Sequence, residues 1–326
     1  MSKNGIWEYI NQLSPKIKEE FRLSVSEGNT PLEGNLALAN DLGLNNIFLK
    51  REDLNPTGSQ KDRGLAFEIS AHLQDGVTDF AISSSGNSAI SAIKLLKGKN
   101  SNLHIFLSSS LSEEKIRRLT KTLPNIAPKI LKHQDIEFEN FKFYFSPKPL
   151  STAFYFSRTK NLVLLRGSTD IYGYEGFKTI AYELKKDVKK FDSIFIPTSS
   201  GTTAKGIYEG FKSFNIIIPF HLVQTTKINT LVHKFDNDFE SKKCSLAESI
   251  VDRIGHRAQE VEEILKNTRG TGWVVSDKEI VEAQEILKKN KISTSNESAL
   301  TIAAIKKAKS KGWNIKNPIC LFTGTK

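Results

Sequence analysis

The chain has 326 residues, of which 38% are hydrophobic and 25% charged, and its formal net charge is +11. This composition is that of a globular domain and argues against a disordered, fibrous or disulfide-stabilised protein. No apolar run approaches the roughly 18 residues of a membrane-spanning helix, and the N-terminus lacks a signal-peptide core, so we expect a cytoplasmic protein without a membrane partner. The two cysteines and six histidines show no ligand spacing, so we expect no metal site.

The positive charge raises the question of nucleic-acid binding. The lysines are scattered in short pairs, such as Lys185-Lys186 and Lys288-Lys289, on helix-like polar faces. Such pairs are typical of solvated helix surfaces. We therefore expect no nucleic-acid partner, and a basic binding protein on a degenerate enzyme fold is a remote alternative.

Short apolar segments alternate along the chain with longer segments of helical periodicity. This alternation predicts βαβ units, and therefore an α/β fold with mostly parallel sheets and flanking helices. Segment 129–160, with its Ser-Pro-Lys-Pro sequence, is expected to be the least regular. The expected strands are 47–50, 80–83, 103–107, 162–165, 194–197, 216–223, 272–275 and 319–322, and the expected helices are 64–73, 88–96, 175–185, 280–288 and 299–307.

Residues 50–64 form the first motif, Lys-Arg-Glu-Asp-Leu-Asn-Pro-Thr-Gly-Ser-Gln-Lys-Asp-Arg-Gly. Its Asn-Pro-Thr-Gly sequence is turn chemistry, and Ser59 to Asp62 are expected to open a helix. In the first turn of that helix, Lys61 lies in the positive field of the helix dipole. That field helps to lower the pKa of the amine, which suits an amine that must form an imine.

Three more segments place small polar residues directly after an expected strand. Residues 83–88 read Ser-Ser-Ser-Gly-Asn-Ser, and their backbone N–H groups at a helix N-terminus suit a carboxylate. Residues 197–206 read Pro-Thr-Ser-Ser-Gly-Thr-Thr-Ala-Lys-Gly, a set of N–H and hydroxyl donors that suits a phosphate. The last expected strand ends at Thr323-Gly324. Taken singly, the two loop segments could each be an ordinary surface turn or loop.

In this order, the segments resemble the motifs of the β-family (fold type II, tryptophan synthase β superfamily) of pyridoxal-5′-phosphate (PLP) enzymes. The resemblance implies that Lys61 binds PLP as a Schiff base, that Asn87 donates to the phenolic oxygen, and that Thr323 meets the pyridine nitrogen. The chain departs from the family pattern at Gln60, where an aromatic residue is common. The resemblance also implies a substrate-carboxylate loop of Ser84, Ser85, Gly86, Asn87 and Ser88, and a phosphate cup of Ser199, Ser200, Gly201, Thr202 and Thr203, in which Ser and Thr replace several glycines.

Residues 174–184 resemble the Glu-Gly-x-Lys-Thr helix start of threonine synthases. Those enzymes usually carry an arginine two positions earlier, which binds the phosphate of O-phosphohomoserine, and Gly173 stands there in this chain. A glycine cannot supply a guanidinium, so Arg158, Arg166 or Lys178 would have to compensate. The predicted function is a threonine synthase-like lyase that acts on a β- or γ-substituted amino acid. The alternatives are a serine/threonine dehydratase or another β-eliminating or β-replacing enzyme, such as a cysteine synthase relative.

The resemblance also implies two lobes with PLP in the cleft between them. We expect a smaller, mobile α/β lobe at residues 55–160 and a larger α/β lobe formed by residues 1–54 and 161–326. Members of this family are usually homodimers, so the resemblance implies a homodimer here.

Overall fold

The computed structural model describes residues 4–121, 123 and 127–325, which divide into two compact units. The first unit is Met1–Glu27 with Lys61–Gly176, and the second is Gly28–Gln60 with Phe177–Lys326. The lobe bounds expected from the sequence, 55–160 against the rest, remain a prediction, and these units have other bounds.

The N-terminal segment belongs to the first unit because its side chains pack against helix α2 (Lys61–Gln74). Trp7 stacks on Phe67 with the ring centroids 5.8 Å apart. The backbone N–H of Leu23 donates to the hydroxyl of Ser70 at 2.8 Å. These contacts join short 3-10 turns, Gly5–Tyr9 and Glu19–Phe21, to a long buried helix.

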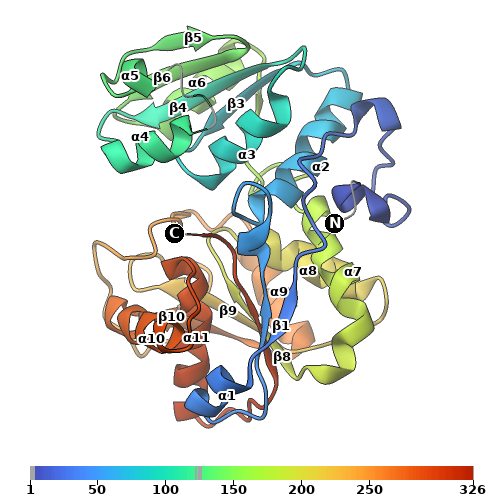
Figure 1. The fold of residues 1–326 in the computed structure, drawn as a ribbon, viewed down its shortest axis with the longest axis vertical. Helices are drawn as coiled ribbons and strands as arrows, with labels where there is room; N and C mark the ends of the chain where they lie inside the picture. The colour runs from blue at the N-terminus through green and yellow to red at the C-terminus, as the bar shows by residue number, and fades with distance from the viewer. Residues whose placement is uncertain (1–3, 122, 124–126, 326) are drawn as a thin grey trace. The chain divides into compact units, whose positions relative to one another are not determined.

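The first unit contains a five-stranded sheet of order β5-β6-β4-β3-β7, in which only the β5–β6 pair is antiparallel. Helix α6 packs against β3 and β4, while α2 and α3 pack against each other (Figure 1). The strands are Asp79–Ser83 (β3), Asn102–Ser108 (β4), Ile136–Phe138 (β5), Phe141–Ser146 (β6) and Val163–Leu164 (β7), and the further helices are Asn87–Leu96 (α3), Glu113–Thr120 (α4), Ala127–Ile130 (α5) and Pro149–Thr159 (α6).

Segment 129–160 was expected to be irregular, and this expectation was wrong. It contains β5, β6 and α6, and β6 pairs in parallel with β4. Phe141 and Phe143 alternate into the core of the sheet, as a strand requires. Pro149 of the Ser-Pro-Lys-Pro sequence is the first residue of α6, a position where proline starts a helix rather than breaking one.

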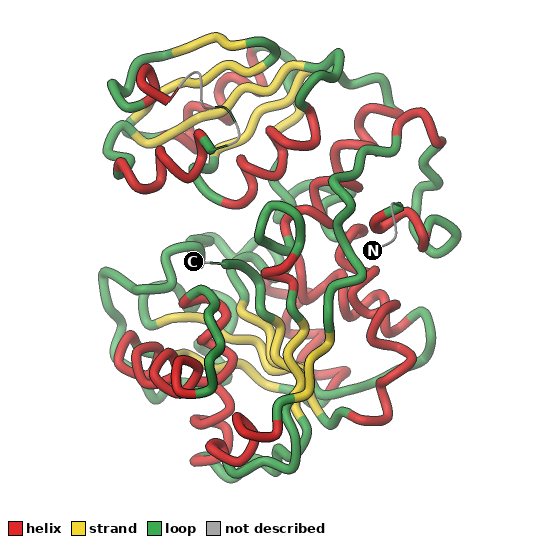
Figure 2. Tube along the Cα trace, in the orientation of Figure 1, coloured by secondary structure: helices red, strands yellow, loops and turns green. Residues whose placement is uncertain are grey.

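The second unit contains a six-stranded sheet of order β1-β2-β11-β8-β9-β10, parallel except for the β1–β2 pair. Helices α1, α10 and α11 bury their apolar sides on one face, and α7, α8 and α9 on the other (Figures 1 and 2). The strands are Leu32–Gly34 (β1), Phe48–Lys50 (β2), Ser193–Pro197 (β8), Phe220–Thr225 (β9), Thr271–Val275 (β10) and Pro318–Leu321 (β11), and the helices are Leu36–Leu42 (α1), Lys178–Leu184 (α7), Thr202–Lys212 (α8), Ala258–Thr268 (α9), Asp277–Lys289 (α10) and Asn296–Ser310 (α11).

The predicted fold class, α/β with mostly parallel sheets and flanking helices, is confirmed. One predicted strand, 216–223, was placed too early, because β9 begins only at Phe220. Pro219 has no N–H to give to a sheet, and Ile217 before it is 71% exposed. Across the residues described, no helix combines the length and hydropathy that crossing a bilayer requires.

His221 of β9 lies inside the second unit in a stack of aromatic rings. Its ring is nearly parallel to those of Phe195 and Trp273, with centroids 4.4 Å and 6.1 Å away. The indole N–H of Trp273 donates to Nδ1 at 3.0 Å, so the proton of the neutral ring lies on Nε2. Nε2 is buried and has no partner among the described residues, and burial lowers the pKa of His221 to about 3.

Replacing His221 with Gln should flatten the acid dependence of stability. In the unfolded chain this histidine binds a proton near pH 6.5, whereas in the folded protein it stays neutral until the pH falls to about 3. The contribution of neutral His221 to the free energy of unfolding is therefore complete above pH 6.5. It is lost as the pH falls from 6.5 toward 3, by up to about 1.4 kcal/mol per pH unit. Urea unfolding between about pH 7 and pH 5 measures the two slopes. The matched control is the exposed His256→Gln, and equal slopes for wild type and His221→Gln would contradict this account.

Candidate functional site

The turn before Lys61 is held by the C-terminal segment of the chain. Thr325 donates its N–H to the carbonyl of Gly58 at 2.9 Å, and Gln60 donates its N–H to the carbonyl of Thr323 at 3.1 Å. Gly58 has φ +83°, and an added Cβ there would lie 2.7 Å from the Thr325 hydroxyl. The residue that precedes Lys61 is thereby fixed to the chain that leaves β11.

Lys61 is the first residue of α2, as the sequence predicted for the helix start, and it is half-buried. Desolvation lowers the pKa of its amine, and the nearby carboxylate of Glu68 opposes that effect. The direction matches the sequence analysis, but the leading cause is burial rather than the helix dipole. A less basic amine is more often unprotonated, which is the form that attacks a carbonyl.

The loop Ser84–Ser88 joins β3 to α3 and is half-buried throughout. A Cβ on Gly86 would meet no atom within 4 Å in the described part of the chain, so the backbone there faces open space. Asn87 begins α3, and its Oδ1 accepts a hydrogen bond from a guanidinium N–H of Arg118 at 2.5 Å. Because its oxygen is engaged, the amide of Asn87 keeps its NH₂ for an acceptor such as a phenolate oxygen.

The predicted phosphate cup lies between β8 and the N-terminus of α8. Gly201 has φ +84°, and a Cβ there would come within 2.7 Å of Val261. The one glycine that the cup retains is thus at the position where backbone and space both require it. Thr202 and Thr203 are buried in the first turn of α8, and the hydroxyls of Ser200 and Thr202 are 2.9 Å apart.

Ser199 is committed to a neighbouring loop. Its hydroxyl oxygen accepts the N–H groups of Val251 and Asp252 at 3.0 and 3.2 Å. Both lone pairs are therefore used, and only its O–H proton remains to donate.

Thr323 follows β11 and is buried, as is Gln60, whose N–H binds the carbonyl of Thr323. The side-chain oxygen Oε1 of Gln60 is buried and has no partner among the described residues. A buried amide oxygen of this kind normally finds a donor, from ordered water or from a bound group. The last residue of this motif, Lys326, lies outside the described residues.

Gly173 has no space for a side chain. An added Cβ would lie 2.4 Å from Cα of Gly167. The segment around it is tied to α2, because His72 pairs with Asp170 at 2.7 Å and the Tyr172 hydroxyl donates to Asp75 at 2.9 Å. The departure read as a missing arginine is therefore a close packing of two backbone segments.

The cations considered as replacements have other surroundings. The guanidinium of Arg166 lies over the ring of Phe154, 5.4 Å from its centroid. Arg158 is exposed on α6. Lys178 begins α7, one residue into the second unit.

The predicted site residues fall into two sets. The first unit holds Lys61 and the loop Ser84–Ser88, and the second holds the cup and Thr323. Arg118 was not predicted from the sequence. Its only signal there is its place in the segment after the expected strand 103–107, because neighbouring parallel strands deliver their following residues to one edge of a sheet.

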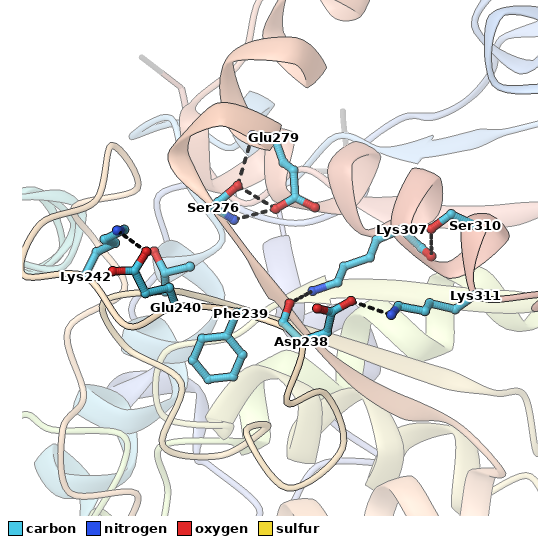
Figure 3. A pocket seen from close by; sticks show the side chains of 10 residues that line it. Asp238, Phe239, Glu240, Lys242, Ser276, Glu279, Lys307, Ser310 and Lys311 are labelled. Atoms are coloured by element: carbon cyan, nitrogen blue, oxygen red, sulfur yellow. Dashed lines mark hydrogen bonds and ion pairs between the residues drawn. The ribbon is translucent and has the colours of Figure 1, made fainter.

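Figure 3 shows a pocket of the second unit, whose lining includes none of these residues. Its charged side chains bind one another: Lys311 pairs with Asp238, and Lys242 with Glu240 at 2.6 Å. Lys307 pairs with Asp236 at 2.6 Å and donates to the carbonyl of Val274 at 2.8 Å. The charged groups of the pocket are therefore largely paired with one another or with neighbouring residues.

Two kinds of known enzyme are similar in sequence to this chain over nearly its whole length. The chain is 28% identical to the threonine synthase of Methanocaldococcus jannaschii, over 98% of this chain and 80% of that protein. It is 25% identical to a catabolic L-threonine dehydratase of Staphylococcus aureus, over 94% of this chain and 87% of that protein.

Solved structures share the fold. A threonine deaminase from Solanum lycopersicum superimposes with a TM-score of 0.75 at 17% identity, over 100% of this chain and 86% of that one. Maize serine racemase gives 0.74 at 18% identity, over 91% of this chain and 88% of that one. The family model described as pyridoxal-phosphate dependent enzyme matches residues 23–324. The chain therefore belongs to the pyridoxal-phosphate-dependent enzymes of fold type II.

Proposed function

We propose that this PLP-dependent enzyme is a lyase of the threonine synthase type, which converts O-phosphohomoserine to threonine and phosphate. The observation that carries the proposal is Lys61, an amine of lowered pKa at the start of α2. The helix start at residues 175–179 and the similarity to two archaeal threonine synthases, at 28% and 27% identity, favour this branch of the family.

The donor set fits the cofactor. We assign the PLP phosphate to the first turn of α8, where Thr202 and Thr203 add buried hydroxyls to the backbone N–H groups. Asn87 donates its NH₂ to the phenolic oxygen, and Thr323 is the neutral partner of the ring nitrogen. PLP supplies the electron sink that lets a β- or γ-leaving group depart. A neutral partner suits elimination and replacement more than transamination.

The chain itself supplies binding and proton transfer. The loop Ser84–Ser88 binds the substrate carboxylate through its N–H and hydroxyl groups. The Lys61 amine can take the α-proton of a bound amino acid and return it later, since its lowered pKa brings it nearer to neutral pH. Loss of phosphate from the γ-carbon and addition of water at the β-carbon together convert O-phosphohomoserine to threonine and phosphate.

A second candidate is a serine or threonine dehydratase, which Gly173 favours because no arginine can stand there. The two functions differ in product, since a dehydratase releases a keto acid and ammonia. A homodimer, a cytoplasmic location, and a cofactor held between lobes 55–160 and the rest are further parts of the proposal. The homodimer and the position of the cofactor follow from the family resemblance. The location follows from features of the sequence.

Borohydride reduction should attach PLP to Lys61. The purified protein should absorb visible light, because an imine conjugated with the ring does so, and reduction should trap that bond. Peptide mass mapping of the reduced protein should find the adduct on Lys61, and Lys61→Ala should lose it. An adduct on another lysine would overturn the assignment.

Replacing Thr202 and Thr203 together with Val should weaken PLP binding by at least about tenfold, because two hydroxyl donors to a charged phosphate are removed while side-chain shape is kept. Titration of the apoprotein with PLP, followed by visible absorbance, measures the dissociation constant. Thr301→Val removes a buried hydroxyl from α11 and serves as the control. Unchanged affinity in the double variant would place the cup elsewhere.

Product analysis with O-phosphohomoserine, threonine, serine and O-acetylserine should separate the candidate functions. Wild-type protein should form threonine and phosphate from O-phosphohomoserine faster than it forms keto acid from threonine or serine. Keto acid and ammonia as the main products, with O-phosphohomoserine untouched, would support the dehydratase instead.

A further inference from the structure

Arg118 is a half-buried cation that donates a hydrogen bond to a neutral amide. It lies on α4, and its guanidinium donates to Oδ1 of Asn87 at 2.5 Å. No carboxylate pairs with it among the residues that the structure describes. The neighbouring Arg117, by contrast, is exposed and pairs with Glu113 one turn earlier at 3.2 Å.

The contact between Arg118 and Asn87 follows from the order of strands in the sheet. β3 and β4 are parallel neighbours, with Ser83 opposite Phe106, so their carboxyl ends lie at the same edge. The chain continues from β3 into the loop Ser84–Ser88 and from β4 into the segment 108–112 that leads to α4. α4 therefore delivers a guanidinium to the loop that we assign to the substrate.

Hydroxyl groups accompany this cation at the same edge. Ser108 ends β4 opposite Ser146 of β6, and the hydroxyls of Ser108 and Ser110 are 2.9 Å apart. A guanidinium with several hydroxyl donors is the combination that binds a phosphate group, since each N–H or O–H can donate to a phosphate oxygen.

Position 173, where threonine synthases usually carry a phosphate-binding arginine, has no room for a side chain in this chain. Gly173 cannot hold any side chain, because its Cβ would overlap Cα of Gly167 at 2.4 Å. Arg166, nearby in sequence, is stacked on Phe154. A phosphate-bearing substrate would therefore need its cation from a residue other than the one at position 173.

We propose that Arg118 is a specificity-determining residue that binds an anionic phosphate ester on the side chain of the substrate. The inference rests on the proposed lyase function and assigns the substrate class of that same site. A guanidinium has five N–H donors and the bond to Asn87 uses one, so Arg118 can orient Asn87 and bind a phosphate together.

The helix dipole could also account for an arginine at position 118, because Arg118 lies in the last turn of α4, where cations are favoured. Arg117 occupies the same turn and carries the same charge. It therefore provides a matched control, because Arg117→Gln removes an equal charge from the dipole but leaves Asn87 and the loop untouched.

The test compares wild type, Arg118→Gln, Arg118→Lys and Arg117→Gln as PLP-loaded proteins. O-phospho-L-homoserine and O-phospho-L-serine serve as phosphorylated probes, with threonine and serine as the uncharged ones. Dissociation constants come from the change in visible absorbance on titration, and KM and kcat from product formation. The absorbance before titration, with thermal unfolding, shows whether each variant is folded and holds its cofactor.

Arg118→Gln should bind the phosphorylated probes about 10- to 100-fold more weakly, as expected for lost charge-assisted bonds, while threonine and serine should show a much smaller loss that reflects only the orientation of Asn87. Arg118→Lys should recover part of the loss, and Arg117→Gln should match wild type. Equal weakening for charged and uncharged probes would reduce Arg118 to a positioning residue for Asn87. That outcome would overturn the inference, and so would no weakening at all.

Failure of the proposed function has a separate signature. A wild type without visible absorbance or a Lys61 adduct would refute the proposed function directly. A wild type that converts O-phosphohomoserine to threonine, with Arg118→Gln binding the phosphorylated probes as tightly as wild type, would refute only the role of Arg118.

Discussion

The antiparallel contact between residues 58–60 and 323–325 fixes the turn that precedes Lys61 in the chain. Two backbone hydrogen bonds, from Thr325 to Gly58 and from Gln60 to Thr323, connect this turn to the end of β11. β11 lies between β2 and β8 inside the six-stranded sheet, so the turn takes its position from a buried strand. The same bonds therefore set the places of Gln60 and Thr323 within the second unit.

Both units repeat one device, a parallel strand that ends where a helix begins. β3 leads to Asn87 at the start of α3, β8 leads to Thr202 at the start of α8, and β4 leads through a serine segment to α4. At α3 and α8 the junction presents backbone N–H groups, to which an amide (Asn87) or hydroxyls (Thr202 and Thr203) are added. α4 differs, because its guanidinium comes from Arg118 in the last turn rather than from the junction.

Much of this was predictable from the sequence, because local patterns encode it. Apolar periodicity placed most strands of the parallel sheets, and the Asn-Pro-Thr-Gly turn placed the start of α2. Strand β6 was missed because its segment was read as irregular, although Phe141 and Phe143 alternate into the core. The hydrogen bond between Arg118 and Asn87 depends on which strands are neighbours, and residue spacing along the chain does not specify that.

Gly173 shows how a tertiary contact can explain a residue that the sequence pattern alone leaves unexplained. In the sequence it is a position without an arginine, whereas in the structure it is a backbone crossing with Gly167 that excludes every side chain. Electrostatic attraction depends on distance and dielectric, not on the element that carries the charge. A cation on α4 can therefore serve an anionic substrate as well as one near Gly173, provided that it reaches the same ligand. Within the described residues no carboxylate pairs with Arg118, so its guanidinium would not have to break an ion pair there in order to bind a phosphate. The packing that closes Gly173 and the hydrogen bond that holds Arg118 both support the proposal that α4 carries the charge that selects the substrate.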